Sequence, residues 1–208
     1  KEKAHVTITV DVNDPNMGSV NPSDAQKLNP DNGTFTNVAA SAKAGYEFVN
    51  WTNDATGEVV TTNGGTLSLT KPANGWTDAS YTANFKELDK VNIYFESNDT
   101  TMGKVDKASQ KLNPETGEAE EVTATPNKGY GFVEWRLKDG DKIDGAKATF
   151  TPAKEQGTKW VEGTTYVAVF AKLDDVKINF KSDNDEMGTV SMPSQSLNPE
   201  IGEAKAVK

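Results

Sequence analysis

Side-chain oxygens that could bind calcium gather in three short loops, each just ahead of a Met-Gly pair. The loops carry Asp11, Asn13 and Asp14 in the first case, Asn98 and Asp99 in the second, and Asp183, Asn184, Asp185 and Glu186 in the third. Calcium needs about six to eight oxygen ligands, and the spacing of an EF-hand loop is absent from all three. We therefore favour ordinary polar turns and predict no metal site.

Catalytic chemistry has few candidates in this chain. The single histidine, His5, has no repeated counterpart, and there is no cysteine nucleophile. A carboxylate pair could serve a glycosidase, but such a pair needs a set spacing in a cleft, and the acids here lie in turn-like sequence. We predict no catalytic residue, no cofactor and no enzymatic activity.

Two tryptophans are the candidate ligand-contact residues. Trp76 and Trp160 follow loop-like sequence, so they could stack on sugar rings or anchor a protein partner. The alternative, which we favour, is that they fill a core short of aliphatic side chains. Trp51 and Trp135 lie within strand-like sequence, and we expect both in the core.

The composition excludes two classes of partner. The formal net charge is -9, and Arg136 is the one arginine among 22 basic residues, whereas nucleic-acid recognition uses clustered Arg and Lys. No apolar run approaches the roughly 20 residues that a membrane helix requires, so we expect no membrane insertion by this segment. Cysteine is absent, which excludes disulfides and Cys-ligated metals.

Landmarks recur along the chain at a nearly constant step. Met-Gly pairs begin at positions 17, 102 and 187, which are 85 residues apart. Leu28-Asn29-Pro30 returns at 112–114 and 197–199, and a glycine follows three residues after each proline. Gly45-Tyr46-Glu47-Phe48-Val49-Asn50-Trp51 returns as Gly129-Tyr130-Gly131-Phe132-Val133-Glu134-Trp135. Repetition of this kind is the signature of tandem structural units.

The landmarks divide the chain into two full copies and one partial copy. We place the first copy at residues 1–89, the second at 90–174 and a truncated third at 175–208. The third copy stops before its aromatic motif would begin. We favour truncation of a longer array over a circularly permuted unit.

Alternation of apolar and polar residues predicts a strand at each end of a copy. Residues 6–12, 91–95 and 176–180 open the copies, and residues 81–85 and 166–170 close the two full ones. No long segment has helical periodicity. Units of about 85 residues are large enough to bury a modest core, so we expect each to fold by itself, as beads on a string.

The aromatic motif reads as a further strand with apolar residues on both faces. Strict alternation would place Phe48 opposite Val49 and Trp51, which predicts a central strand covered on both sides. The tetrad Pro126-Asn127-Lys128-Gly129 precedes the second motif and is typical of a turn, so we expect a hairpin there.

This motif, together with residues 122–127 ahead of it, resembles the divergent internalin B-type repeat of bacterial surface proteins. The first copy departs from the pattern, with Ser41-Ala42-Lys43-Ala44 where the Thr-Pro-Asn turn would lie. The resemblance implies a mainly β fold of tandem small β-rich domains, either β-grasp-like or a small antiparallel sandwich. It also implies an extracellular protein attached to the cell wall, and it brings no catalytic residues.

Two hypotheses for function follow. In the first, the copies form a non-enzymatic stalk or spacer that projects an adhesive region, and their partners are the neighbouring repeats of the same chain. In the second, the repeats themselves bind a host protein or glycan through Trp76 and Trp160, and weak contacts gain by avidity.

Overall fold

The computed structural model describes residues 3–60, 64–154 and 157–208, and these residues contain strands but no helix. They form two compact units, one made of Lys1–Lys90 with Asn113–Thr116 and the other of Val91–Leu112 with Gly117–Lys208. The predicted mainly β fold of tandem repeat domains is therefore confirmed. The copy boundaries after residues 89 and 174 stay predictions. The short segment Asn113–Thr116, which lies inside the second copy as we place it, belongs to the first unit.

The first unit contains two sheets. The larger sheet, in strand order, consists of β3 (Gln26–Leu28), β1 (Val6–Val12), β8 (Ala79–Glu87), β5 (Tyr46–Asn53) and β6 (Val59–Val60). The smaller sheet consists of β2 (Gly18–Asn21), β4 (Val38–Ala42) and β7 (Thr66–Leu67).

The second unit repeats this arrangement. Its larger sheet has the order β11 (Ser109–Leu112), β9 (Val91–Ser97), β15 (Thr165–Lys172) and β13 (Tyr130–Leu137). Its smaller sheet has the order β10 (Gly103–Val105), β12 (Val122–Pro126) and β14 (Thr149–Phe150). The predicted opening and closing strands of both copies are all present.

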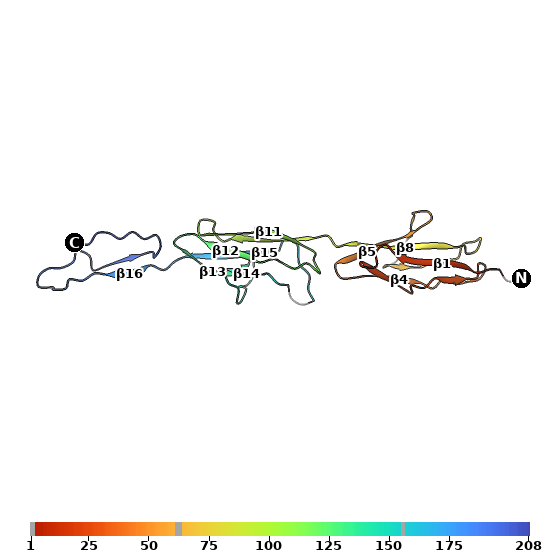
Figure 1. Ribbon diagram of the computed structural model, residues 1–208, viewed down its shortest axis with the longest axis horizontal. Coiled ribbons are helices and arrows are strands. Elements are labelled where there is room, and N and C mark those ends of the chain that lie inside the picture. Colours follow the sequence, from red (N-terminus) through yellow and green to blue (C-terminus); the bar gives the residue numbers. More distant parts are fainter. Residues whose placement is uncertain (1–2, 61–63, 155–156) are drawn as a thin grey trace. The chain divides into compact units, whose positions relative to one another are not determined.

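The core of each unit lies between its two sheets. In the first unit Trp51 and Phe85 come from the larger sheet and Val38 from the smaller, and all three are buried in one cluster. Figure 1 shows the labelled strands of the second unit lying along nearly the same axis, as in sandwiches whose sheets pack aligned. Because the described residues hold no helix to cover a sheet, the sandwich describes these units better than the β-grasp.

Each larger sheet contains one parallel pair, so it is mixed and not purely antiparallel. The first strand of the copy, β1, pairs in parallel with the last, β8, over five residues from Ile8 opposite Ala79 to Val12 opposite Ala83. The second unit has the same pairing between β9 and β15. Parallel strands require a crossover, and here the smaller sheet and the aromatic strand lie within it.

The prediction of a doubly covered aromatic strand is wrong, and a β-bulge is the reason. The pairing of β5 with β8 shifts register between Phe48 and Asn50, and that of β13 with β15 shifts between Phe132 and Glu134. One extra residue reverses the alternation, so the aromatic residues on either side of the bulge both face the core. The skipped residue points outward: Val49 is 46% exposed and Val133 is 54% exposed.

The predicted turn at residues 126–129 forms, but it does not make a hairpin. Tyr130 N donates to Asn127 O at 3.1 Å, and Gly129 has φ +85°. The strands on either side belong to different sheets, since β12 pairs with β10 and β14 while β13 pairs with β15. The turn therefore carries the chain from one layer of the sandwich to the other.

The repeated Met-Gly pair is explained by an aromatic ring above the glycine. A Cβ on Gly103 would lie 2.6 Å from Cε1 of Phe170, and one on Gly18 would likewise overlap the ring of Phe85. Both rings are buried. The glycine is thus required because the closing strand of the copy lays its phenylalanine directly against the backbone.

Gly103→Ala is expected to destabilise the second unit by about 1–3 kcal/mol, because the added methyl group forces the packed ring of Phe170 to move. Thermal unfolding of the full chain measures this. Gly188→Ala is the matched control, since a Cβ at Gly188 has nothing within 4 Å. Equal effects of the two substitutions would contradict the packing explanation.

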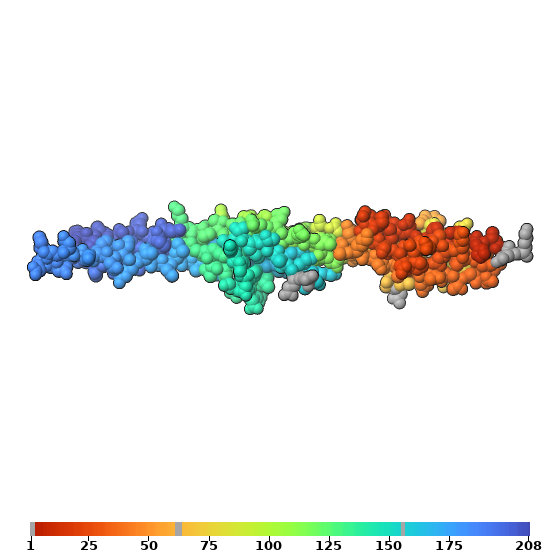
Figure 2. Space-filling view, turned by 60° about the horizontal axis from the view of Figure 1, so that its bottom comes forward, coloured from red at the N-terminus to blue at the C-terminus, as the bar shows by residue number. Residues whose placement is uncertain are grey.

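The partial third copy forms only the beginning of the same sheet. Strand β16 (Val176–Asn179) pairs antiparallel with β17 (Ser194–Leu197), and Val176 lies opposite Leu197 as Val91 lies opposite Leu112. All four residues of β16 are exposed. In Figure 2 this copy, coloured blue, is a narrower body than the green and cyan part of the second unit.

Candidate functional site

The two candidate ligand-contact residues lie inside the cores. Trp76 is 7% exposed and Trp160 is 6% exposed. Each indole N–H is in use: Trp76 Nε1 donates to Gly33 O at 2.8 Å, and Trp160 Nε1 donates to Gly117 O at 2.7 Å. Ligand contact through these residues stays a prediction, and their burial counts against it because neither ring offers an open face for stacking.

In each full copy, an asparagine of the acidic loop forms hydrogen bonds with the closing strand. Asn13 Nδ2 donates to Phe85 O at 2.8 Å, and Phe85 N donates to Asn13 Oδ1 at 2.9 Å. Asn98 makes the same pair of bonds with Phe170, at 3.2 and 2.9 Å. A side-chain amide here imitates the next residue of a strand and lengthens the ladder of the parallel pair.

The aspartates of these loops accept hydrogen bonds within their own turns. Asp14 Oδ1 accepts from Asn16 N at 2.8 Å, and Asp99 Oδ1 accepts from both the N–H and the hydroxyl of Thr101. The bond from the Thr101 hydroxyl is the main reason that the pKa of Asp99 is lowered. These contacts are those of the polar turns that we favoured over a calcium site.

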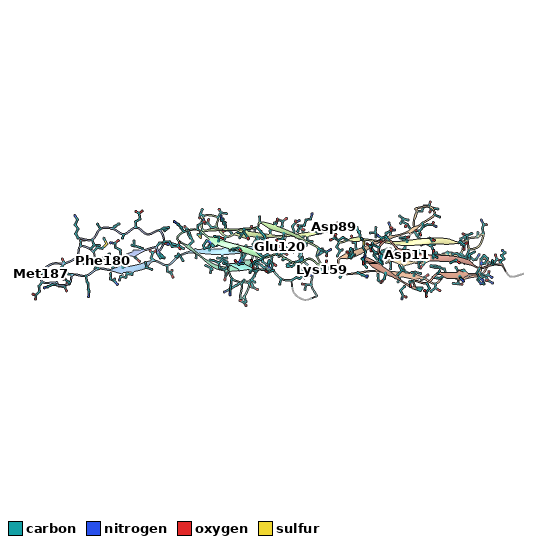
Figure 3. All side chains as sticks on the ribbon, viewed as in Figure 1. Asp11, Asp89, Glu120, Lys159, Phe180 and Met187 are labelled. Atoms are coloured by element: carbon teal, nitrogen blue, oxygen red, sulfur yellow. The ribbon has the colours of Figure 1, made fainter. Side chains whose placement is uncertain are left out.

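The third acidic loop lies at the tip of the partial copy. Figure 3 shows Met187, which follows this loop, farther out than Phe180, and Met187 is highly exposed. Across residues 3–60, 64–154 and 157–208, no group of three or more His, Cys, Asp or Glu side chains is arranged to hold a metal ion.

No cluster of perturbed titratable groups marks an active site in the described part of the chain. Burial raises the pKa of Tyr166, which lies in the core of the second unit. A hydrogen bond with Glu47 raises the pKa of exposed Lys86, and one with Lys107 lowers the pKa of exposed Glu120. Each shift has its own local cause, and His5 is exposed beside the first strand.

The best-organised polar site is a loop of one copy bound to a glycine of the copy before it. We call residues 113–116 and 198–201 the docking loops and the glycines 45 and 129 with their following tyrosines the Gly-Tyr turns. In the second unit Asn198 Nδ2 donates to Gly129 O at 3.0 Å, and Gly129 N donates to Glu200 Oε2 at 2.6 Å. Both polar groups of one glycine are thus bound by one loop.

The same contacts occur inside the first unit. Asn113 Nδ2 donates to Gly45 O at 2.9 Å, and Gly45 N donates to Glu115 Oε2 at 2.6 Å. The two asparagines are among the few buried polar residues, at 8% exposure for Asn113 and 7% for Asn198. Asn113–Thr116 accordingly lies in the first unit, with the glycine that it binds.

The docking loop is closed by hydrogen bonds to the side chain of its own asparagine. Asn198 Oδ1 accepts from Glu200 N at 3.0 Å and from Ile201 N at 3.2 Å, and Asn113 Oδ1 accepts from the two corresponding amides. The amide oxygen therefore closes the loop while the amide nitrogen faces outward. This is the side-chain turn that asparagine favours.

Glycine is required in the Gly-Tyr turn for two reasons. Gly45 and Gly129 have φ of +88° and +85°, a region that residues with a Cβ rarely adopt. A Cβ would also meet the docking loop, at 2.9 Å from Thr116 Oγ1 on Gly45 and at 2.7 Å from Ile201 Cδ1 on Gly129.

Sequence reasoning missed this site, although its parts were visible. The repeated Leu-Asn-Pro triplet served only as a landmark of the repeat, and the glutamate two residues after the asparagine was not used. Both recur in the second and third copies. Their partners lie 68 to 71 residues earlier in the chain, a separation that no local pattern reveals.

Comparison with known proteins assigns the repeat to a family. Two stretches, residues 8–89 and 95–174, match the family model described as the divergent InlB B-repeat domain. The resemblance drawn from the aromatic motif is thereby confirmed. No curated protein matches the chain. Among the described residues, no helix has the length and apolar character needed to cross a membrane.

Proposed function

Because the chain belongs to the divergent InlB B-repeat domain family, we propose that this repeat region of a bacterial surface protein is a non-enzymatic stalk or spacer that carries tension. It projects an adhesive region of its parent protein from the cell wall. Its immediate partners are the neighbouring repeats of the same chain.

The parallel pairing of the first and last strands of a copy carries this proposal. A force applied through the two ends of a copy pulls β1 and β8 in opposite directions along their common axis. All hydrogen bonds of the ladder from Ile8 to Val12 are then loaded together in shear. Strands that open from one end would break their bonds one at a time and resist less.

Side chains reinforce the same ladder at both of its ends in the first unit. Thr7 N donates to Asp78 Oδ1 at 2.7 Å, and the hydroxyls of Thr9 and Ser80 lie 2.7 Å apart. At the other end Asn13 N donates to Ala83 O at 3.0 Å, and its side chain binds Phe85. The ladder therefore extends beyond the five paired residues.

Stretching single molecules of the full chain by its ends tests the proposal. The chain has no cysteine, so terminal cysteines can attach it uniquely. We expect two distinct force peaks, each lengthening the chain by roughly 25–30 nm, since an extended residue spans about 3.3–3.6 Å. Unfolding without a resolved peak would contradict a spacer that carries tension.

Asn98→Ala is expected to lower one of the two peak forces, because it removes the side-chain bonds that extend the ladder of β9 and β15. Asn127→Ala is the matched control. The Asn127 amide binds the carbonyls of Thr100 and Thr101, outside the parallel pair, so its loss should leave both peaks in place. Equal reductions by the two variants would exclude the ladder as the element that resists force.

A further inference from the structure

We propose that residues 29–32 of the first copy form a third docking loop, which binds the Gly-Tyr turn of another repeat of this family. The partner is a repeat that presents a glycine with positive φ followed by an aromatic strand. This interaction requires only a second repeat, so it does not depend on the tension-bearing role proposed above.

The first-copy loop has the internal structure of the two occupied docking loops. Asn29 Oδ1 accepts from Asp31 N at 2.9 Å and from Asn32 N at 3.3 Å, as Asn113 and Asn198 accept from the corresponding amides. Gly33 N donates to Asn29 O at 2.9 Å, and Gly202 N donates to Asn198 O at the same distance.

The loop is also held in place by the core of its own unit. Trp76 N donates to Pro30 O at 2.8 Å, and its indole donates to Gly33 O. Trp160 holds the second copy's loop through Gly117 in the same way. The first-copy loop is thus preorganised, and a partner need not order it on binding.

What distinguishes the first-copy loop is that, among the described residues, its outward groups bind no glycine of another copy. Asn29 is half-buried, whereas Asn113 and Asn198 are buried beneath the glycine that they bind. Its Nδ2 donates no hydrogen bond to any residue that the structure describes. Asp31, in the position of Glu115 and Glu200, is exposed, and its contact is a surface ion pair with Lys3 at 2.7 Å.

These outward groups match one partner closely. The carbonyl of a partner glycine would accept from Asn29 Nδ2, and the N–H of the same glycine would donate to the carboxylate of Asp31. A glycine in the left-handed region presents both groups on one side without a Cβ between them, as Gly45 and Gly129 do for their loops. Asp31 is one methylene shorter than glutamate, so we expect its bond to be the weaker of the two.

The test adds a copy ahead of the first one. Residues 90–174 are joined directly before His5, in place of residues 1–4, which keeps the repeat step of 85 residues. Amide hydrogen exchange of the added copy's Gly129 is then measured by NMR. With Asn29→Ala and Asp31→Ala together, we expect this amide to exchange about tenfold faster, because it loses the hydrogen-bonded carboxylate. Asp31→Glu should slow its exchange instead.

Two observations would overturn the proposal. One is an exchange rate at the added glycine that does not change with the double substitution, and the other is an added copy that stays unfolded, since the loop has then failed to complete it. The chain without the added copy provides the control. There the double substitution should leave the exchange of Gly45 and Gly129 unchanged, because both are bound by other loops.

Discussion

Trp135→Ala is expected to lower the free energy of unfolding of the second unit by about 3–5 kcal/mol, the range for removing a fully buried large aromatic side chain. Trp135 has no exposed surface and packs against Phe95, Phe132 and Phe150, with ring centroids 6.3, 6.3 and 4.8 Å away. Its indole N–H also donates to Ala148 O at 3.2 Å, so truncation removes one of the two hydrogen bonds that this carbonyl accepts, the other coming from Ala124 N at 2.9 Å. Urea unfolding followed by NMR signals of each unit measures the loss.

Val133→Ala is the matched control for this substitution. Val133 lies two residues earlier on the same strand, where strict alternation would place it on the face of Trp135. The bulge instead turns it to solvent, and we expect its truncation to change stability by no more than about 0.5 kcal/mol. A loss comparable with that of Trp135→Ala would mean that the strand has no bulge in solution.

The same strand shows what sequence patterns predict and where they fail. Alternation placed the opening and closing strands correctly, since β1, β8, β9 and β15 each contain the residues expected. Burial of Trp51 and Trp135 was also predicted. The bulge was not, because it depends on how a strand pairs with its neighbour, and a single sequence read along one strand carries no information on register.

The turn ahead of the aromatic strand illustrates a second limit. Local residues determine that the chain turns at Asn127 and Gly129, and this prediction is confirmed by the hydrogen bond from Tyr130 N to Asn127 O. Whether the next strand pairs with the previous one or crosses to the other sheet is decided by distant strands. In this fold β15 occupies the edge of β13, which leaves β12 to pair in the smaller sheet.

The docking loops were missed for a third reason, which is that each contact joins two copies of the repeat. Treating each copy as a separate bead limits the search for partners to one copy, whereas the partners of Asn113 and Asn198 lie 68 and 69 residues earlier, in the copy before. The useful signal was the coincidence of two repeated motifs, a glycine that must have positive φ and an asparagine loop with a glutamate. Repeats can thus stabilise one another through specific polar contacts and not only by stacking.

Removing the third copy's docking contacts should therefore weaken the copy before it. We expect Asn198→Ala with Glu200→Ala to destabilise strands β13 and β15 by about 2–4 kcal/mol, the sum of a neutral and a charge-assisted hydrogen bond with a buried backbone group. Hydrogen exchange of the amides in those strands reports this local free energy. The reference variant is Asn29→Ala in the same chain, which has the same loop but no glycine bound to it.

The location of the faster exchange distinguishes coupling between copies from a general loss of stability. If the contact couples the copies, the double substitution speeds exchange in β13 and β15 and leaves β5 and β8 unchanged, because Gly45 keeps its own docking loop. If exchange instead rises only around Asn198 itself, the hydrogen bonds of the loop do not contribute to the stability of the copy that it contacts. In the coupled case each repeat is completed by the one that follows it, so the stability of a copy depends on its downstream neighbour.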